Sequence, residues 1–370
     1  MDNHTCRSCR GSDGEVVLDL GQQPACDYFP HRDDPGPDPG YPLQMWLCSS
    51  CGLAQLLADP TMPEEPRGTE PAALVAQAAD AVERVSVAGW LTERGTVAEY
   101  GSPHGGSWLG LLAARGLGPA GDGGQADVIL DCFGLMHAAD QRSALADRAA
   151  RVIPGGVLML QYHALSTIIC GRQWNALRHG HYAYYSTTAL TAMLAAVGFS
   201  PRTAWQFDLY GGTVLLAATR DGDGISGPDE TVQTLLANDT KIGVRDPSAF
   251  LALQRNVQTH AKNLHDWLAA ERAAGRKVLG YGAASRAVAL LCHAQVDRLL
   301  LPAVIDASPA KQGRRMPGSG IPVADPAQLA VRRPDTVLLF VPDLLAEVRD
   351  AFPQVEAAGG RWVDVETFGS

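Results

Sequence analysis

Two pairs of cysteines near the N-terminus constrain the fold of this chain more than any other feature of its sequence. Cys6 and Cys9 form one C-x-x-C knuckle, and Cys48 and Cys51 form a second. Four thiolates in two such knuckles are typical ligands of a tetrahedral zinc ion. The pattern predicts a structural zinc site, because a site closed by four cysteines leaves no position for water or substrate. Buried thiols without a metal are the alternative.

Two apolar segments between the knuckles favour a small β-rich module. Residues 16–21 and 43–47 can pair as strands, and their pairing would bring the two knuckles together. The four remaining cysteines are isolated in the sequence, and we expect them in the core because free cysteine packs as a small hydrophobe. They are Cys26, Cys132, Cys170 and Cys292.

The composition is that of a globular chain with a small-molecule partner. Its 370 residues are 46% hydrophobic and 19% charged, which predicts two or three domains. The formal net charge of −10 gives no attraction to nucleic acid or to an anionic membrane. The sequence has neither an apolar run of about 18 residues nor a signal-peptide pattern, so we expect a cytoplasmic protein.

The middle of the chain has the pattern of an α/β domain. A short apolar strand runs into a glycine-rich turn over residues 97–106, and a helical segment follows. Further apolar strands are expected at 127–133, 156–161 and 212–218, separated by helices. Such an opening is usual for nucleotide-binding folds, in which glycines let the backbone approach the ligand.

The C-terminal part carries a second nucleotide-type pattern. Residues 278–286 read as a strand, a turn of small residues and a helix start, and residues 302–306 as the next strand, which ends in Asp306. This spacing suits a pyrophosphate at the helix N-terminus and a hydroxyl at Asp306. Alone it would suggest NAD, and a packing turn without a ligand is the remaining alternative.

The order of these parts resembles the zinc-finger sugar C-methyltransferases of deoxysugar and antibiotic biosynthesis. The resemblance is carried by residues 18–24, 99–101, 211–212, 280–286 and 309–313. It implies an α/β chain with a four-cysteine zinc-binding module, a class I methyltransferase-like Rossmann domain and a C-terminal Rossmann-like domain. We place these domains at residues 1–60, 61–225 and 226–370.

In the resembled family a histidine removes a proton beside a ketone, and the enolate attacks the methyl group of S-adenosylmethionine (SAM). His181 matches that histidine, whereas Gly180 replaces a family glutamate and Arg178 a family tyrosine. A histidine with tyrosine neighbours can supply both a base and a donor to the enolate oxygen. A patch packed at a domain interface is the alternative. The predicted catalytic cluster is His179, His181, Tyr182 and Tyr184.

The resemblance also implies ligand-binding residues. For SAM, the residual motif consists of Glu99, Gly101 and Gly105. For the substrate, a nucleotide-linked sugar, the predicted residues are Arg178, Tyr210, Gly280, Tyr281, Gly282, Ser285, Arg286, Asp306 and Lys311.

The SAM site departs from the family pattern. Only residues 119–125 separate the helix after the first strand from the strand at residue 127. Seven residues cannot form two strands and a helix, because one parallel crossover needs a dozen or more. The glycine loop also carries Pro103 and His104, and proline removes a backbone donor. The sequence therefore predicts that the second and third strands of the methyltransferase domain are deleted, with half of the SAM site.

Three functions remain open after the sequence analysis. We place first an enzyme that enolises a ketosugar-type substrate without SAM, giving epimerisation, isomerisation or elimination. The alternative is a SAM-dependent C-methyltransferase of a nucleotide-linked 4-ketosugar. The third is a non-catalytic scaffold partner. The missing ribose-binding acid argues against methyl transfer, because each lost polar anchor costs roughly 1–3 kcal/mol.

Overall fold

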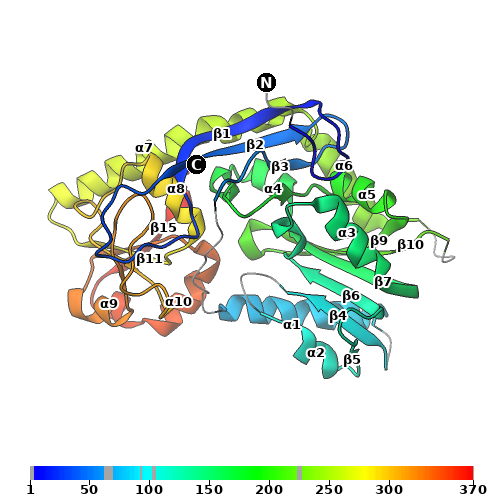
Figure 1. Ribbon diagram of the computed structural model, residues 1–370. Helices are drawn as coiled ribbons and strands as arrows, with labels where there is room; N and C mark the ends of the chain where they lie inside the picture. Colours follow the sequence, from blue (N-terminus) through cyan, green and yellow to red (C-terminus); the bar gives the residue numbers. More distant parts are fainter. Residues whose placement is uncertain (1–3, 62–69, 92–93, 102–105, 223–226, 370) are drawn as a thin grey trace.

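Three β-sheets organise the protein. A computed structural model describes residues 4–61, 70–91, 94–101, 106–222 and 227–369. In Figure 1 the six-stranded sheet and its helices form one lobe (green and cyan), and the C-terminal sheet forms the other (orange and red). A long hairpin from the N-terminal sheet (blue) passes over both lobes.

The N-terminal sheet is antiparallel, with the strand order β1-β2-β3-β8. Val16 pairs with Trp46 and Asp19 with Gln44, which confirms the predicted strand pairing. The fourth strand, β8, comes from the middle of the chain, so the segment around His181 is joined to the zinc module. The strands are β1 (Gly14–Pro24), β2 (Gly40–Cys48), β3 (Ala54–Leu56) and β8 (Ala183–Tyr184).

The second sheet has the order β5-β4-β6-β7-β10-β9. The first four strands are parallel, and β10 is antiparallel to both of its neighbours. The central strands are almost continuously buried, as expected when helices cover both faces of a sheet. The strands are β4 (Thr96–Tyr100), β5 (Gly118–Pro119), β6 (Ala126–Cys132), β7 (Val152–His163), β9 (Phe199–Phe207) and β10 (Thr213–Arg220).

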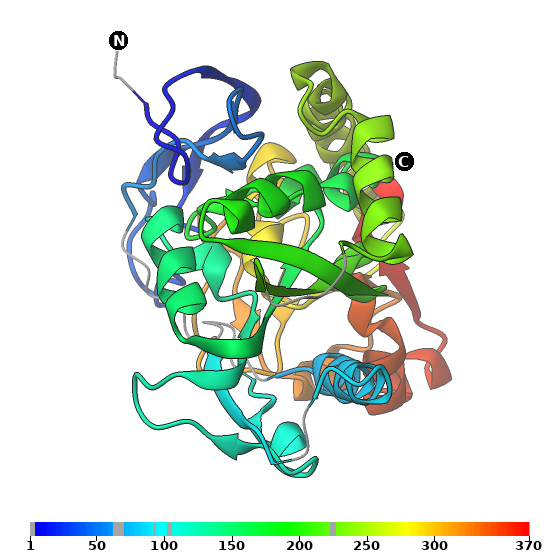
Figure 2. The same cartoon turned by 90° about the vertical axis from the view of Figure 1, so that its right-hand side faces the viewer.

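Helices lie on both faces of this sheet. Figures 1 and 2 show α1 and α2 on one face and α3 and α5 on the other. Side chains of Asp140 and Ser186 accept hydrogen bonds from the first turns of α3 and α5, which fixes where these helices begin. The helices are α1 (Ala72–Val87), α2 (Leu109–Ala113), α3 (Gln141–Ala150), α4 (Leu165–Cys170), α5 (Thr187–Ala195) and α6 (Glu230–Ile242).

The edge of this sheet is short where the sequence predicts a deletion. Between α2 and β6 the described chain contains one strand, β5, which is two residues long. It pairs in parallel with β4, Thr96 with Gly118 and Val97 with Pro119. The sequence analysis did not anticipate this remnant, because two residues give no periodic signal. It carries no acidic side chain.

The C-terminal sheet is parallel throughout, with the order β13-β12-β11-β14-β15. Its strands are β11 (Val278–Tyr281), β12 (Val304–Ile305), β13 (Val323–Ala324), β14 (Thr336–Leu339) and β15 (Arg361–Asp364). Its helices are α7 (Leu251–Ala273), α8 (Ser285–His293), α9 (Ala327–Arg332), α10 (Leu345–Ala351) and α11 (Gln354–Ala357). The predicted α/β fold class is thereby confirmed.

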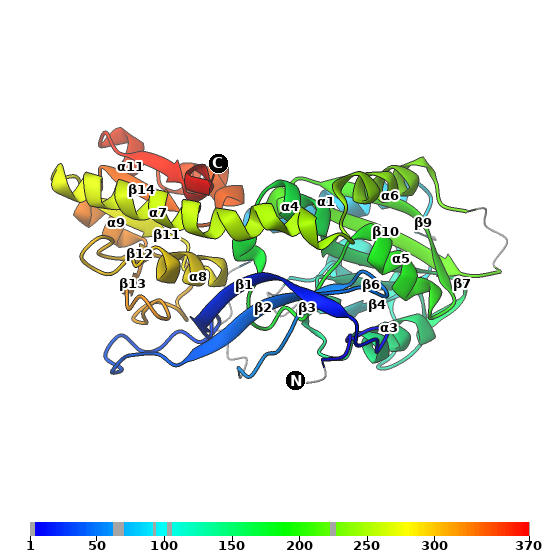
Figure 3. The same ribbon diagram turned by 90° about the horizontal axis from the view of Figure 1, so that it is seen from above.

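The N-terminal hairpin holds the two lobes together. Figure 3 shows α7 running across both lobes beside β1, and Asp19 exchanges two backbone hydrogen bonds with the side chain of Gln254 on α7. The loop between β1 and β2 carries Asp38, which forms a two-bond ion pair with Arg315 at 2.6 and 2.7 Å. None of the helices in the described residues has the length and apolar composition needed to cross a bilayer.

Candidate active site

The four predicted zinc ligands meet at one point. The Sγ atoms of Cys6, Cys9, Cys48 and Cys51 all lie within 4.8 Å of one another. The pairs Cys6–Cys51 and Cys9–Cys48 are each 3.6 Å apart. A zinc ion with bonds of about 2.3 Å to a tetrahedron of sulfurs places them about 3.8 Å apart, so the cluster fits zinc. Backbone N–H of Gly11 points at Sγ of Cys9, 3.4 Å away.

A cavity of about 240 Å³ lies between the two lobes. Its walls come from the carboxyl ends of β4, β6 and β7, from the segment before β8, and from the start of α8. Ligands of open α/β sheets bind outside the carboxyl ends of the strands, so this is the expected place for a site. The predicted site residues that line it are Glu99, Arg178, His181, Tyr184, Tyr210, Ser285, Arg286 and Lys311.

Other predicted site residues do not line this cavity. Nε2 of His179 lies 3.3 Å from the carbonyl oxygen of Pro42 in the zinc module, and burial lowers the pKa of this histidine. Tyr182 lies under the guanidinium of Arg7, 4.7 Å from its ring centre. The other predicted residues outside the cavity lining are Gly101, Gly280, Tyr281, Gly282 and Asp306, and Gly105 falls outside the described residues.

His181 is buried against a guanidinium and a second histidine. Nε of Arg178 lies 2.9 Å from Nε2 of His181. A guanidinium has donors and no acceptor, so the ring nitrogen accepts and this contact requires a neutral His181. The ring of His137 packs edge-on against His181 with 4.5 Å between centroids. The cavity therefore holds a neutral imidazole whose one accepting nitrogen is occupied by Arg178, so it can act as a base only when the guanidinium turns to another acceptor.

The hydroxyl of Tyr184 is engaged by the backbone. It accepts from the N–H of Arg178 at 3.0 Å and donates to the carbonyl of Ala176 at 3.3 Å. Burial raises the pKa of Tyr184 well above its ordinary value. Tyr184 therefore fixes the shape of the segment before His181, although its ring reaches the cavity.

Arg178 connects the two lobes at the cavity. Its Nη1 donates to Oγ of Ser285, the first residue of α8, at 2.7 Å. Arg286 follows on the same helix, and its nearest carboxylate contact is Glu366 at 3.9 Å. Cationic side chains from both lobes thus face the cavity, together with the N-terminal end of α8.

The backbone N–H groups of the turn before α8 form hydrogen bonds within the C-terminal domain. Oδ2 of Asp306 accepts from the N–H of Ala283 at 2.7 Å, and Oδ1 accepts from the N–H of Ser308 at 2.8 Å. Gly282 donates its N–H to Ile305 at 2.8 Å. Asp306 and the first donors of the turn are therefore engaged within the domain, whereas the sequence analysis assigned them to a ligand.

Neighbouring residues of this turn are also structural. Nζ of Lys311 donates to the carbonyl of Ala283 at 2.9 Å and lies 4.9 Å from the ring centre of Phe29. Tyr281 packs against Phe352 and Trp362, and burial raises its pKa to about 12.

The sequence analysis missed several cavity residues at the ends of strands. His163 ends β7, and burial followed by the charges of Arg286 and Arg178 lowers its pKa to about 3. Asp343 comes from the loop after β14, and burial raises its pKa. Gln161 lies just before His163. These residues could have been predicted from the sequence, because polar residues at the end of an apolar strand often lie at the ligand-binding edge of an α/β sheet.

The cavity extends past Glu99 and Phe133 at the ends of β4 and β6, and past Trp108 at the start of α2. Glu99 accepts hydrogen bonds from the hydroxyl of Ser107 and from the N–H of Trp108, so its carboxylate holds the start of α2. The neighbouring strand β5 ends at Pro119 without an acid that could hold the ribose of SAM.

The comparisons with known proteins agree with this architecture. Residues 6–64 match the model of a zinc binding domain, and residues 208–365 match that of a C-methyltransferase C-terminal domain. C-methyltransferase NovU of Streptomyces niveus is 24% identical over 97% of this chain and 94% of its own length. A four-cysteine module, a methyltransferase-like sheet and a second parallel sheet are thus combined in one chain. In both matched segments and in this relative, the chain is similar to zinc-binding C-methyltransferases.

Two solved methyltransferases show more distant likeness. Magnesium protoporphyrin IX methyltransferase of Synechocystis PCC 6803 is 11% identical with a TM-score of 0.29, covering 40% of this chain and 84% of its own. N-methyltransferase NodS of Bradyrhizobium japonicum WM9 is 15% identical with a TM-score of 0.29, covering 41% and 89%. At these scores neither likeness bears on the reaction.

Proposed function

We propose that the protein is a SAM-dependent C-methyltransferase that first forms the enolate of a ketone-bearing substrate in the cavity between the lobes. The observation that carries the proposal is the buried, neutral His181, which lines this cavity in contact with Arg178. A relative that matches 97% of this chain and 94% of its own length is a C-methyltransferase, which supports methylation of carbon.

Enolisation is the step that the residues of this chain can perform. His181 accepts the proton from the carbon beside the ketone, and the electron pair of the broken C–H bond moves towards the carbonyl oxygen. Arg178 and Arg286 lie in the same cavity, and their positive charge favours an anionic enolate there. SAM supplies an electrophilic methyl group to the resulting carbon nucleophile.

A nucleotide-linked ketosugar is the substrate class we propose. The support is the pair of cations that line the cavity, Arg178 from one lobe and Arg286 from the other, together with the start of α8. Phosphate oxygens suit arginine forks and helix N-termini. Asp343 also lines the cavity, and burial raises its pKa.

Enolisation without methyl transfer is the second candidate. It is favoured by β5, which ends without a ribose-binding acid, and by the use of Glu99 to hold α2. The sequence analysis placed this chemistry first. The comparisons give it no support, since the full-length relative is a C-methyltransferase.

One incubation separates the two candidates. The zinc-loaded protein is mixed in D₂O with a thymidine diphosphate-linked 4-ketosugar, with and without SAM carrying a ¹³C-methyl group, and the sugar is analysed by mass spectrometry. Incorporation of the ¹³C-methyl group supports methyl transfer, and deuterium uptake alone supports the second candidate. If the sugar gains neither the ¹³C-methyl group nor deuterium, both candidate functions are contradicted. His181→Ala should abolish both reactions, and His31→Gln, at an exposed position, should leave them unchanged.

A further inference from the structure

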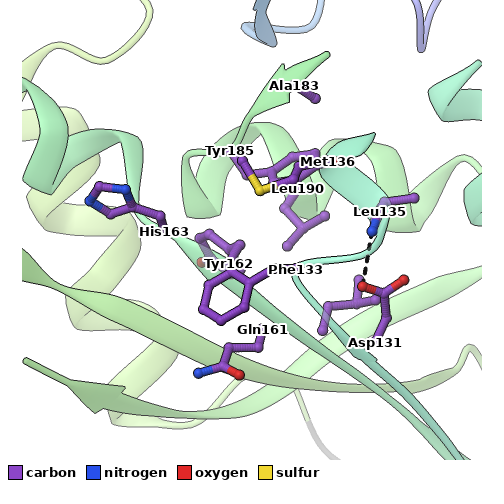
Figure 4. Close-up of a pocket in the computed structure, with 11 residues that line it drawn as sticks. Asp131, Phe133, Leu135, Met136, Gln161, Tyr162, His163, Ala183, Tyr185 and Leu190 are labelled. Carbon is purple, nitrogen blue, oxygen red and sulfur yellow. Dashed lines mark hydrogen bonds between the residues drawn. The ribbon is translucent and has the colours of Figure 1, made fainter. Parts of the chain in front are cut away.

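His163 is the second histidine of the cavity. It ends β7 and lines both the main cavity and a small recess of about 10 Å³ behind it. Figure 4 shows its ring apart from those of Phe133 and Tyr162, which line the recess. Nε2 of His163 is buried and has no hydrogen-bond partner among the described residues. A buried polar atom of this kind is rare in folded proteins and points to a ligand partner.

The surroundings keep this imidazole neutral. Burial is the largest cause of its low pKa, and the positive charges of Arg286 and Arg178 add to it. A hydrogen bond between the ring and the side chain of Gln173 acts in the opposite direction, so only Nε2 of His163 is left without a partner among the described residues. A neutral imidazole carries one N–H donor and gives up that proton only at very high pH, so it can hold a hydrogen bond to an oxygen throughout a reaction.

Other buried histidines of the chain differ from His163. Nε2 of His260 lies 2.9 Å from the carbonyl oxygen of Val365, and Nε2 of His179 lies 3.3 Å from that of Pro42. Neither lines the cavity. Nδ1 of His179 is also buried without a partner among the described residues. His163 differs from both histidines because its unpartnered Nε2 belongs to a residue that lines the cavity.

We infer that His163 donates a hydrogen bond from its neutral ring to the ketone oxygen of the substrate. This role rests on the enolisation proposed above. The C–H bond beside the ketone breaks, its electron pair forms the C=C bond, and the carbonyl π pair moves to the oxygen. The proton goes to His181, while His163 keeps its own proton. Two histidines in different surroundings thereby take the two roles of base and donor.

The test compares two substitutions at this position. The deuterium exchange of the thymidine diphosphate-linked 4-ketosugar is measured for the full-length, zinc-loaded protein. His163→Phe keeps a ring but removes the donor, and it should slow exchange about 100-fold to 1,000-fold, as loss of an oxyanion donor does elsewhere. His163→Gln keeps an N–H donor, and it should exchange deuterium at least tenfold faster than His163→Phe. Exchange by His163→Phe within threefold of the unaltered protein would overturn the inference.

An NMR measurement tests the charge state independently of turnover. Histidine labelled with ¹⁵N gives distinct ring signals for the neutral and protonated forms, and the signal missing in His163→Gln belongs to His163. It should stay neutral from pH 8 to pH 5. Titration near pH 6.5 would overturn the inference while leaving the role of His181 intact. Absence of exchange in the unaltered protein would overturn enolisation itself, and the role of His163 with it.

Discussion

Nε of Arg178 lies 2.9 Å from Nε2 of His181, while Nη1 of the same guanidinium donates to Oγ of Ser285 at 2.7 Å. One side chain therefore joins the proposed base to the first turn of α8 in the other lobe. Because the fork of arginine holds both partners at fixed directions, the position of His181 depends on how the two lobes meet.

Replacing Arg178 by lysine should slow enolisation at least tenfold. A single ammonium group cannot reproduce the planar fork that serves His181 and Ser285 together. Deuterium exchange of the ketosugar measures the effect. Arg298→Lys, at an exposed position, is the matched control. An Arg178→Lys variant with exchange within twofold of the unaltered protein would show that Arg178 does not position the base.

Loss of a zinc ligand should disturb the active site as well as the N-terminus. Cys48→Ser is expected to lower the thermal midpoint by about 10 °C, because zinc binding contributes folding free energy and several kcal/mol are lost with it. Exchange activity should fall in parallel. Zinc content and calorimetry provide the measurements, and Cys170→Ser, outside the cluster and exposed, should behave as the unaltered protein does.

Breaking the ion pair between Asp38 and Arg315 should destabilise the protein by about 3 kcal/mol. Both side chains are about 10% exposed, and removing one partner leaves a buried charge. Urea unfolding of Asp38→Asn at pH 7 measures the loss. Asp33→Asn, whose side chain is 78% exposed, should change stability by less than about 1 kcal/mol.

The contribution of Asp38 should also depend on pH. Burial opposes ionisation, but hydrogen bonds from Arg315 and Gly318 outweigh it and lower the pKa of Asp38. A lowered carboxyl pKa gives stability that is present above the unfolded value, near pH 4, and is lost as the pH falls through the folded value. The difference between Asp38→Asn and the unaltered protein should therefore shrink below pH 4. A difference that is equal at pH 7 and pH 3 would contradict this linkage.

His163 should make the folded protein sensitive to mild acid. Its folded pKa of about 3 lies below the ordinary value of 6.5, so the unfolded chain binds a proton that the folded chain does not. Stability is then full above about pH 6.5 and falls by about 1.4 kcal/mol per pH unit below it. Urea unfolding of His163→Gln and of the unaltered protein is compared between pH 7 and pH 4. The free energy of unfolding should fall less steeply with decreasing pH in the variant. An equal dependence on pH in both proteins would contradict the low pKa of His163.

The features that the sequence predicted correctly are local. The spacing of the cysteines predicted the cluster, and the apolar segments around Val16 and Trp46 predicted a strand pair that the structure confirms. The succession of strands and helices predicted the α/β class. In each case, neighbouring residues carry the pattern, so no knowledge of distant contacts was needed.

The features that the sequence did not predict depend on distant contacts. Asp306 ends a strand as a ligand-binding acid would, yet a nearby turn takes both of its oxygens. An acid at a strand end looks the same in either role. His163 gains its low pKa first from burial and then from the charges of Arg286 and Arg178, which come from other elements of the fold. A single histidine after an apolar strand gives no sign of that environment.

The outermost strand of the zinc module, β8, comes from the segment that forms the cavity wall. Ala54 pairs with Tyr184, and the N–H of Leu56 donates to the carbonyl of Tyr182, one residue from His181. We therefore expect metal loading and the geometry around His181 to be lost together. If the proposed reaction holds, a cell short of zinc would lose it with the fold of the N-terminus, and truncating the zinc module would not yield a smaller working enzyme.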